Sequence, residues 1–166
     1  MWHTTFIALH AATAVVALVS GAVALWRPTW FGTYLWSLAG MALFLVLAIG
    51  AGWGEIDMPL RLLFSAFVVL AAFMVWRAAQ ARRIRPSGSM GPSASYVEHI
   101  GFTLVALFDA FAVIAVLNSG APGWMVATIG VLIAVAGHFV LRATRSRLVT
   151  GRVSGSHTVG AGRNPA

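Results

Sequence analysis

The chain alternates between long apolar stretches and short polar breaks over most of its length. A helix needs about 20 mainly apolar residues to cross roughly 30 Å of bilayer hydrocarbon, and each stretch has that length. Backbone groups that face lipid must be hydrogen-bonded within their own segment, so helices are expected rather than open strands. The pattern predicts an all-α, polytopic membrane protein, in which residues 1–147 form an antiparallel bundle of five transmembrane helices with spans of about 4–26, 32–53, 59–80, 97–118 and 123–143.

The polar breaks between the predicted spans contain residues that interrupt helices. Each break has a proline within it or at its end, at Pro28, Pro59, Pro86 and Pro122. After the last span, residues 148–166 are rich in glycine, serine and threonine. Such a composition buries too little apolar surface to fold, so this segment is predicted to be a disordered tail.

The composition agrees with a membrane protein, because 60% of the residues are hydrophobic and only 9% are charged. Soluble domains have about 25% charged residues. The chain has no cysteine, which excludes disulfides and thiolate metal sites, and no lysine, which excludes Schiff-base chemistry. Any site chemistry must therefore come from a small set of other polar residues.

Arginine is distributed unevenly among the loops. If the predicted spans alternate in direction, ten of the eleven arginines fall on one side of the membrane and only Arg61 falls on the other. Cytoplasmic loops retain positive charge, so the N-terminus is predicted outside and the C-terminus in the cytoplasm. The arginines lie beside the spans without interleaved aromatic residues, so membrane lipids are expected contacts and nucleic acid is not.

Small residues follow one face of the first span and one face of the last span. Spacings of three and four residues place them on a single side of each helix. Small side chains let membrane helices approach closely, so both faces are predicted to pack against other membrane subunits or a second copy of the chain. The predicted helix-packing residues are Ala14, Ala17, Gly21, Gly130 and Ala134.

Asp109 lies in the middle of the fourth span, among apolar residues. A charged carboxylate there costs about 3 kcal/mol on insertion scales, so it must be protonated, paired or hydrated. A neutral carboxyl that donates to a backbone carbonyl is the simplest state; a cofactor site or a polar subunit contact are alternatives. Its expected depth of roughly 13 Å is close to that of His10, about 9 Å. Glu98 shares its helical face, so Asp109, Glu98 and His10 form a candidate proton or ion relay.

Three histidines, His10, His99 and His138, are candidate cofactor ligands. His99 begins the fourth span and His138 lies one turn before the fifth ends, so their depths differ by about 3 Å in neighbouring helices. Paired imidazoles could ligate the iron of haem b, or hold a divalent ion of unknown identity beside a carboxylate. The alternatives are structural: Glu98 and His99 as hydrated interface residues, and His138 bonded to a neighbouring helix.

The sequence lacks the motifs that would indicate hydrolytic or nucleotide-dependent catalysis. It has no HExxH pair and no phosphate-binding glycine loop. The candidate nucleophiles Ser20, Ser37 and Ser65 have no base within predictable reach. These absences favour a non-enzymatic protein.

The segment LHAATAVVALVSGAVALWR, with Gly32 and Tyr34 after it, resembles the opening of a family of small bacterial multi-pass membrane proteins of unknown function. Those proteins begin with a Leu-His helix that ends in a Gly-x-x-Ala-Leu-x-Arg stretch, here Gly21 to Arg27, and a basic loop with histidine, glycine and tyrosine follows. The loop histidine is missing here, because residues 28–31 are Pro, Thr, Trp and Phe. The resemblance covers about the first third of the chain and implies a multi-pass protein of a bacterial inner membrane.

Three functions follow from these patterns. The first is a non-enzymatic membrane component, an accessory or self-associating subunit that packs through its small-residue faces. The second is a haem- or metal-binding electron-transfer protein that uses His10, His99 or His138. The third is a proton-coupled carrier that uses Asp109 and His10. They require different geometries: open small-residue faces, paired histidines, or an acid beside an imidazole.

Overall fold

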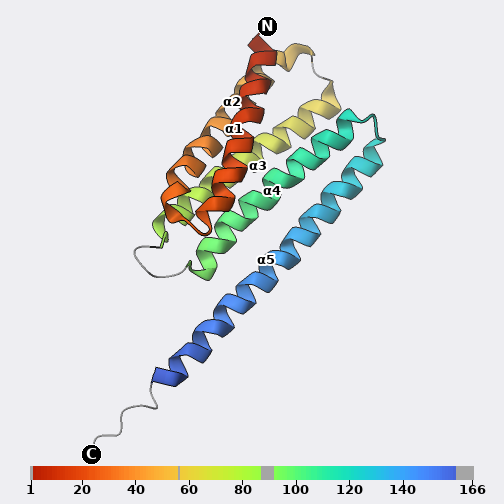
Figure 1. Ribbon diagram of the computed structural model, residues 1–166. Coiled ribbons are helices and arrows are strands. Elements are labelled where there is room, and N and C mark those ends of the chain that lie inside the picture. The colour runs from red at the N-terminus through yellow and green to blue at the C-terminus, as the bar shows by residue number, and fades with distance from the viewer. Residues whose placement is uncertain (1, 56, 87–91, 160–166) are drawn as a thin grey trace, which may run out of the picture.

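The computed structural model describes residues 2–55, 57–86 and 92–159, with side chains throughout except at residues 55, 145 and 147–159. Within these ranges every regular element is helical and no strand is present. Figure 1 shows the arrangement of the helices. The elements are α1 (Trp2–Ala24), the 3-10 helix η1 (Pro28–Trp30), α2 (Phe31–Gly52), the 3-10 helix η2 (Trp53–Glu55), α3 (Met58–Arg83), α4 (Ala94–Asn118) and α5 (Gly123–Val159).

Five helices in the described part of the chain are long and apolar enough to cross a membrane. In chain order they are α1, then η1 together with α2, then α3, then α4, and finally the first part of α5, Gly123–Thr144. The prediction of an all-α chain with five membrane-length helices is therefore confirmed. The predicted boundaries differ from the helix ends by a few residues, because the ends depend on local capping as well as on the apolar pattern.

Local chemistry explains where several helices begin and end. Pro28 and Pro59 lie in the first turns of η1 and α3, where a missing amide proton costs no helical hydrogen bond. Ser93 caps α4, since its Oγ accepts a hydrogen bond from the Tyr96 amide at 3.2 Å. Gly120 has a φ of +77°, a left-handed conformation that favours glycine and lets the chain turn between α4 and α5.

Helix α5 is longer than the sequence pattern predicts. Its membrane-length part ends at Thr144, but the helix continues to Val159. Residues 148–159, which their composition assigns to a disordered tail, thus continue α5 in the structure, and residues 160–166 lie outside the described residues. A helix that is already nucleated extends at low cost, and no proline follows Pro122 until Pro165.

Helices α1 and α2 form the most extensive helix pair. Ala14 and Ala17 of α1 are buried, with 3% and 0% exposure. A Cβ atom at Gly21 would lie 2.8 Å from Cδ2 of Tyr34 in α2 and 2.9 Å from Cδ2 of Leu104 in α4. The small-residue face predicted in the first span is therefore used inside the chain's own core, and is not left open for a partner.

Buried hydroxyl groups join α4 to α1 and α2 near the start of α4. The Tyr34 hydroxyl donates to Oγ1 of Thr103 at 2.7 Å, and Thr103 donates to the His99 carbonyl at 2.8 Å. The Tyr96 hydroxyl donates to the Ala24 carbonyl at 3.1 Å. Because each of these buried hydroxyls has a partner, the polar groups strengthen the apolar core instead of weakening it.

Removing one of these hydrogen bonds should weaken the fold measurably. The substitution Tyr34→Phe keeps the ring but deletes the donor to Thr103, which retains the His99 carbonyl as its own acceptor. Interhelical hydrogen bonds in membrane proteins contribute about 0.6 kcal/mol on average, so a loss of that order is expected. A double-mutant cycle with Thr103→Val, measured by unfolding in mixed micelles, gives the coupling; zero coupling would contradict this role.

Helix α5 packs along α4 and has no comparably extensive contact with α1, α2 or α3 (Figure 1). Large side chains of each helix lie over glycines of the other. Val105 of α4 covers Gly137, and Leu141 of α5 covers Gly101. The contact line on α5 also includes Gly130, one of the predicted packing residues.

Ala134 does not belong to the α4–α5 contact line. The predicted face of the last span passed from Gly130 through Ala134 to His138, but both Ala134 and His138 are exposed. At 3.6 residues per turn, Gly137 lies within about 20° of Gly130 around the helix, whereas Ala134 and His138 are displaced by about 40° and 80°. In the structure Gly130 faces α4 of the same chain, and Gly137 lies on this contact line where the sequence pattern had placed Ala134.

Candidate functional site

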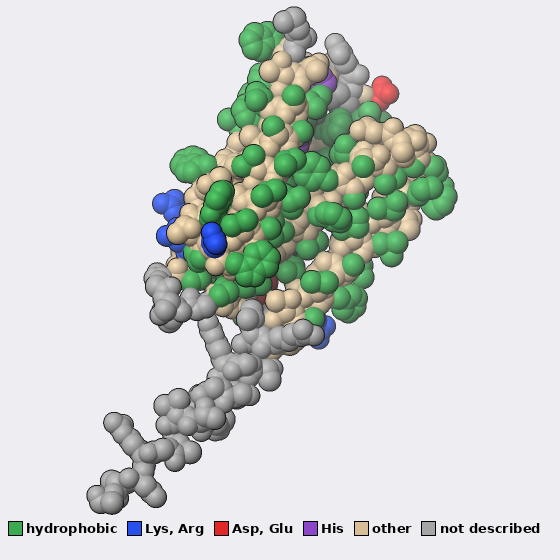
Figure 2. Space-filling model, viewed as in Figure 1, with side chains coloured by type: hydrophobic (Ala, Val, Ile, Leu, Met, Phe, Trp, Pro, Cys, Tyr) green, Lys and Arg blue, Asp and Glu red, His purple; other side chains and the backbone are tan. Residues whose placement is uncertain are grey.

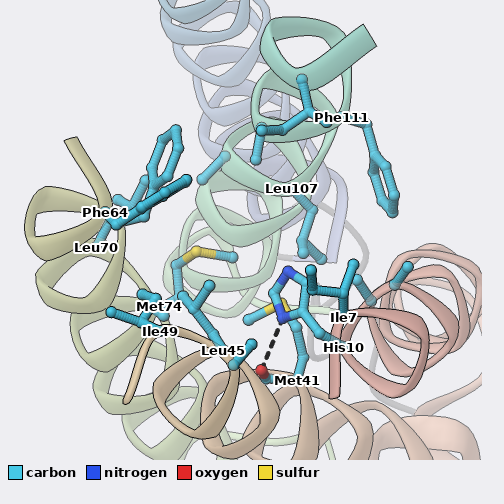
Figure 3. A pocket seen from close by; sticks show the side chains of 18 of the residues that line it. Ile7, His10, Met41, Leu45, Ile49, Phe64, Leu70, Met74, Leu107 and Phe111 are labelled. Atoms are coloured by element: carbon cyan, nitrogen blue, oxygen red, sulfur yellow. Dashed lines mark hydrogen bonds between the residues drawn. The ribbon is translucent and has the colours of Figure 1, made fainter. Parts of the chain in front are cut away.

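An apolar cavity of about 380 Å³ lies between α1, α2, α3 and α4. It is in the half of the molecule where α1 and α3 begin and where α2 and α4 end. Small-molecule pockets commonly have volumes of about 300–1,000 Å³ and mostly hydrophobic walls, so the size and the lining fit a small apolar ligand. Large side chains of the wall include Leu45, Ile49, Phe64, Leu70, Met74, Leu107 and Phe111 (Figure 3).

The cavity exists because all four helices place small side chains around it. Larger residues at these positions would fill the space, as in most protein interiors. Buried Met41 and Met74 lie at its inner end, whereas the exposed residues His3 and Asn118 lie at its opposite end, which we call the mouth. In Figure 2, histidine side chains are visible in a recess near the end that holds the N-terminus. The small residues are Ala11, Ala14, Ala48, Ala71, Ala106 and Ala110.

His10 of α1 supplies a polar group inside the cavity. Its Nδ1 lies 2.9 Å from the carbonyl oxygen of Met41 in α2. A carbonyl oxygen only accepts hydrogen bonds, so Nδ1 carries the proton in this bond. In the neutral ring, Nε2 is then an unprotonated nitrogen that can accept a hydrogen bond or bind a metal. Figure 3 shows this second nitrogen on the far side of the ring from Met41, directed toward Leu107 and the centre of the cavity.

Asp109 lies on the side of α4 away from the cavity. Its Oδ1 is buried without a hydrogen-bond partner, and a Cβ atom at Gly130 of α5 would be 3.7 Å from it. Leu107 and Phe111, which line the cavity, are two residues away in each direction, or about 200° around the helix. Asp109 therefore faces α5 while His10 faces the cavity, and the structure does not bring the two predicted relay residues together.

Glu98 pairs with Arg77 of α3, because a guanidinium nitrogen lies 3.7 Å from its carboxylate oxygen. The guanidinium also lies over the Phe102 ring, 5.2 Å from the ring centroid, and 6.0 Å from that of Phe73. Arginine is well suited to this position, since its planar cation pairs with a carboxylate and stacks on aromatic faces. The carboxylate thus serves a contact between α3 and α4, and Asp109 lies three turns further along α4.

The contacts of Arg77 predict an order of effects among three substitutions. Arg77→Met should reduce thermal stability more than Glu98→Gln, because it removes the ring contacts as well as the ion pair. The ion pair is only partly buried, with side-chain exposures of 19% for Arg77 and 39% for Glu98, and glutamine keeps the shape of the side chain, so Glu98→Gln should have the smaller effect. The matched control is Arg82→Met, at an exposed position five residues further along α3. Equal melting temperatures for the two arginine variants would contradict the assignment.

His99 and His138 do not face each other. His99 is two residues before Gly101, which contacts α5, so it lies on nearly the opposite side of α4, and its Nδ1 is buried without a hydrogen-bond partner. His138 is exposed, with its ring beside Phe139 at a centroid distance of 6.1 Å. Among the described residues, no three His, Cys, Asp or Glu side chains are grouped so that they could hold a metal ion. The paired arrangement expected for haem b is therefore not formed by His99 and His138.

Sequence reasoning missed the cavity, because its walls are ordinary apolar residues whose relation depends on how four helices pack. It also missed the role of Arg77. The sequence contains a signal of this role in the position of Arg77. It lies more than a turn before Arg82 and Arg83, the two arginines in the last turn of α3. The seven-residue spacing of Gly130 and Gly137 was a second unused signal of a packing line.

No family model, curated protein or solved structure matches this chain. The resemblance of the first third to small bacterial multi-pass proteins stays a prediction. The case for a function therefore depends on the geometry of the cavity and of His10.

Proposed function

We propose that this chain is a non-enzymatic membrane protein that binds a small apolar molecule in the cavity between α1, α2, α3 and α4. The observation that carries the proposal is an apolar space of about 380 Å³ with an imidazole inside it. Protein interiors are close-packed, so a space of this size bordered by four helices is unusual and suits a small apolar molecule. Such a ligand would be recognised mainly by shape.

The proposed setting is the inner membrane of a bacterium, with the five helices in antiparallel order, the N-terminus outside and the C-terminus in the cytoplasm. The uneven distribution of arginine supports this orientation. The cavity then lies in the outer half of the bilayer, with His3 and Asn118 near the outer boundary. An apolar ligand would reach it from the hydrocarbon or from the outer headgroup level.

The absence of cysteine makes this orientation simple to test. A single Ser119→Cys, between α4 and α5, should react with a membrane-impermeant maleimide in intact cells. A single Thr29→Cys, in η1, should react only after the membrane is permeabilised. Both positions are exposed, so they form a matched pair. The reverse labelling pattern would invert the proposed orientation.

A role as an accessory or self-associating subunit is a second candidate, and the exposed outer face of α5 favours it. The small-residue face of α1 is buried within the chain, so α5 would have to supply the contact. Its large exposed side chains Val131, Leu132, Val135 and Phe139 are 47–63% accessible. Membrane lipid or another membrane helix would cover them.

Of the candidate residues for a haem site and for a proton-coupled carrier, only His10 lines the cavity. An Nδ1 proton donated to a backbone carbonyl is also the usual arrangement of a metal-bound imidazole, so His10 could bind haem or metal through Nε2. An absorption spectrum of the purified protein separates the alternatives. A Soret band that disappears in His10→Leu would replace the apolar-ligand proposal with a haem site.

The proposed binding can be measured with hexylbenzene that carries a fluorine on its ring, observed by fluorine NMR with the protein in lipid nanodiscs. Partitioning into lipid is not saturable, whereas binding to one cavity is, so a saturable fraction defines the site. Ala110→Phe places a large ring in the cavity and should abolish that fraction. Ala115→Phe, at an exposed position on the same helix outside the cavity lining, is the control.

Saturable binding that is lost in Ala110→Phe and kept in Ala115→Phe would support the proposal. Purely linear partitioning in the unmodified protein would overturn it. Equal saturable binding in all three proteins would also overturn it, because the ligand would then occupy some other surface. Thermal unfolding of each variant establishes that it is folded.

A further inference from the structure

We propose that the cavity selects a lipid-soluble molecule with a single phenolic hydroxyl, which donates a hydrogen bond to Nε2 of His10. This inference rests on the proposed apolar-ligand function and adds the chemical class of the ligand. It depends on which nitrogen of His10 faces the cavity, on the other side chains of the wall, and on where the mouth lies.

The hydrogen bond to Met41 determines whether His10 accepts or donates a hydrogen bond on the cavity side. Because Nδ1 gives its proton to the Met41 carbonyl, Nε2 presents a lone pair to the cavity when the ring is neutral. A ligand hydroxyl can donate to that lone pair. A ligand carbonyl or ether oxygen would instead face another acceptor, and a polar group buried without a partner is costly.

Among the residues that the structure describes, no second polar side chain lines the inner part of the cavity. Apart from His10, the polar residues of the lining are His3, in the first turn of α1, and Asn118, the last residue of α4. His3 is seven residues before His10, or about 10 Å along the helix. A small ring held at His10 therefore meets one polar group only, and a second hydroxyl on the ring would lie against apolar walls.

The walls favour an aromatic ring at this depth. Phe64 and Phe111 come from two different helices, and Met41 and Met74 lie beside His10 in Figure 3. Aromatic faces and thioether sulfurs make favourable contacts with rings beyond simple burial. A phenol has both the ring that suits these walls and the acidic O–H that suits an imidazole acceptor.

The shape of the cavity leaves room for an apolar substituent that points toward the mouth. The inner end is closed by buried side chains, and the polar residues His3 and Asn118 are exposed at the mouth. A substituent para to the hydroxyl would point away from His10 toward that end. The recess in Figure 2 shows that histidine side chains can be reached from this side of the molecule.

Four probes of nearly the same shape test the inference by competition with the fluorinated hexylbenzene in nanodiscs. They are para-hexylphenol, its methyl ether, 4-hexylcatechol and unlabelled hexylbenzene; the catechol keeps the hexyl group para to one hydroxyl. One good hydrogen bond is equivalent to roughly a 3- to 10-fold change in affinity, so the phenol should bind about that much more tightly than the ether. The catechol should bind less tightly than the phenol, because its second hydroxyl would lie against apolar walls.

Variants of His10 assign the effect to Nε2. His10→Leu should bind hexylbenzene as before and should lose the preference for the phenol over the ether. His10→Gln can donate to Met41 through its amide nitrogen and accept from the ligand through its oxygen, so it should keep part of the preference. If His10→Leu acted only by loosening the packing, it would reduce hexylbenzene binding as well. In that case His10→Gln would not restore the preference for the phenol over the ether.

The outcomes separate the two proposals. If hexylbenzene binds saturably but the phenol and the ether bind equally, the phenolic class is wrong and the apolar cavity stands. Tighter binding of the catechol would overturn the single-hydroxyl class and would indicate a second hydrogen bond inside the cavity. If no probe binds saturably, the proposed function itself is wrong.

Discussion

Gly21→Val is expected to lower the melting temperature of the detergent-solubilised protein more than any other single change in the α1–α2–α4 core. A Cβ atom at this position already lies within 2.9 Å of Tyr34 and Leu104, and valine adds two methyl groups beyond it. Tyr34 cannot swing away without losing its hydrogen bond to Thr103. Overpacking of a core costs about 1–3 kcal/mol and occasionally more, and the upper end is expected here.

The control for this substitution is Gly50→Val. Gly50 lies in the last turns of α2, and a Cβ atom there would meet no other atom within 4 Å. Both variants make the same chemical change in an apolar helix, so only the surroundings differ. For a chain of this size, 3 kcal/mol corresponds to a fall of roughly 6–12 °C for Gly21→Val, whereas Gly50→Val should be nearly unchanged. Equal melting temperatures would show that Gly21 is not at a close contact.

Gly137→Leu is expected to separate α5 from α4 while the other four helices stay folded. A Cβ atom at Gly137 would overlap the side chain of Val105, with one Cγ at 2.8 Å and the Cβ at 3.1 Å. Valine is branched at Cβ and stiff, so it cannot turn aside as a longer side chain could. Helix α5 has no extensive contact with α1, α2 or α3, so its loss from α4 leaves their packing in place.

The separation can be measured by disulfide trapping, because the natural chain has no cysteine. Val113→Cys with Gly130→Cys places one thiol on each helix at positions where a Cβ at residue 130 lies 3.3 Å from a Val113 methyl group. Mild oxidation should link the helices in this background and should fail after Gly137→Leu is added. Gly123→Leu, at a position with no atom within 4 Å, is the control. Efficient linking in the Gly137→Leu background would contradict the proposed contact line.

The number and type of helices could be predicted from the sequence because a single physical requirement determines them. Lipid demands apolar length and internal hydrogen bonding, and both are visible in one pass along the chain. The end of α5 was less predictable. Glycine and serine after residue 148 suggest disorder, while a helix that already exists can continue through the same residues.

The direction of individual side chains could be predicted only in part. His10 was expected to face other helices, and it does, because the small residues that follow it determine the packed side of α1. Asp109 was expected to meet His10 because the two have similar depths, but depth does not specify rotation about the helix axis. In the structure that rotation turns Asp109 toward Gly130.

The cavity is the feature that no inspection of the chain could have revealed. Each of the alanines around it also suits a tightly packed helix contact, and Ala17, which is outside the cavity lining, is used in that way. Whether small residues bring two helices together or leave a space among four depends on the distances between all the axes. That relation appears only when the helices are placed together.

The most direct test of the account concerns the two nitrogens of His10 in a lipid bilayer. Nitrogen NMR of histidine-labelled protein, with His10→Leu to assign the signal, reports which nitrogen carries the proton. At a pH at which the ring is neutral, we predict the proton on Nδ1, an unprotonated Nε2, and a shift of the Nε2 signal when para-hexylphenol is added but not when its methyl ether is added. A proton on Nε2 in place of Nδ1, or an Nε2 signal that neither probe changes, would contradict the account.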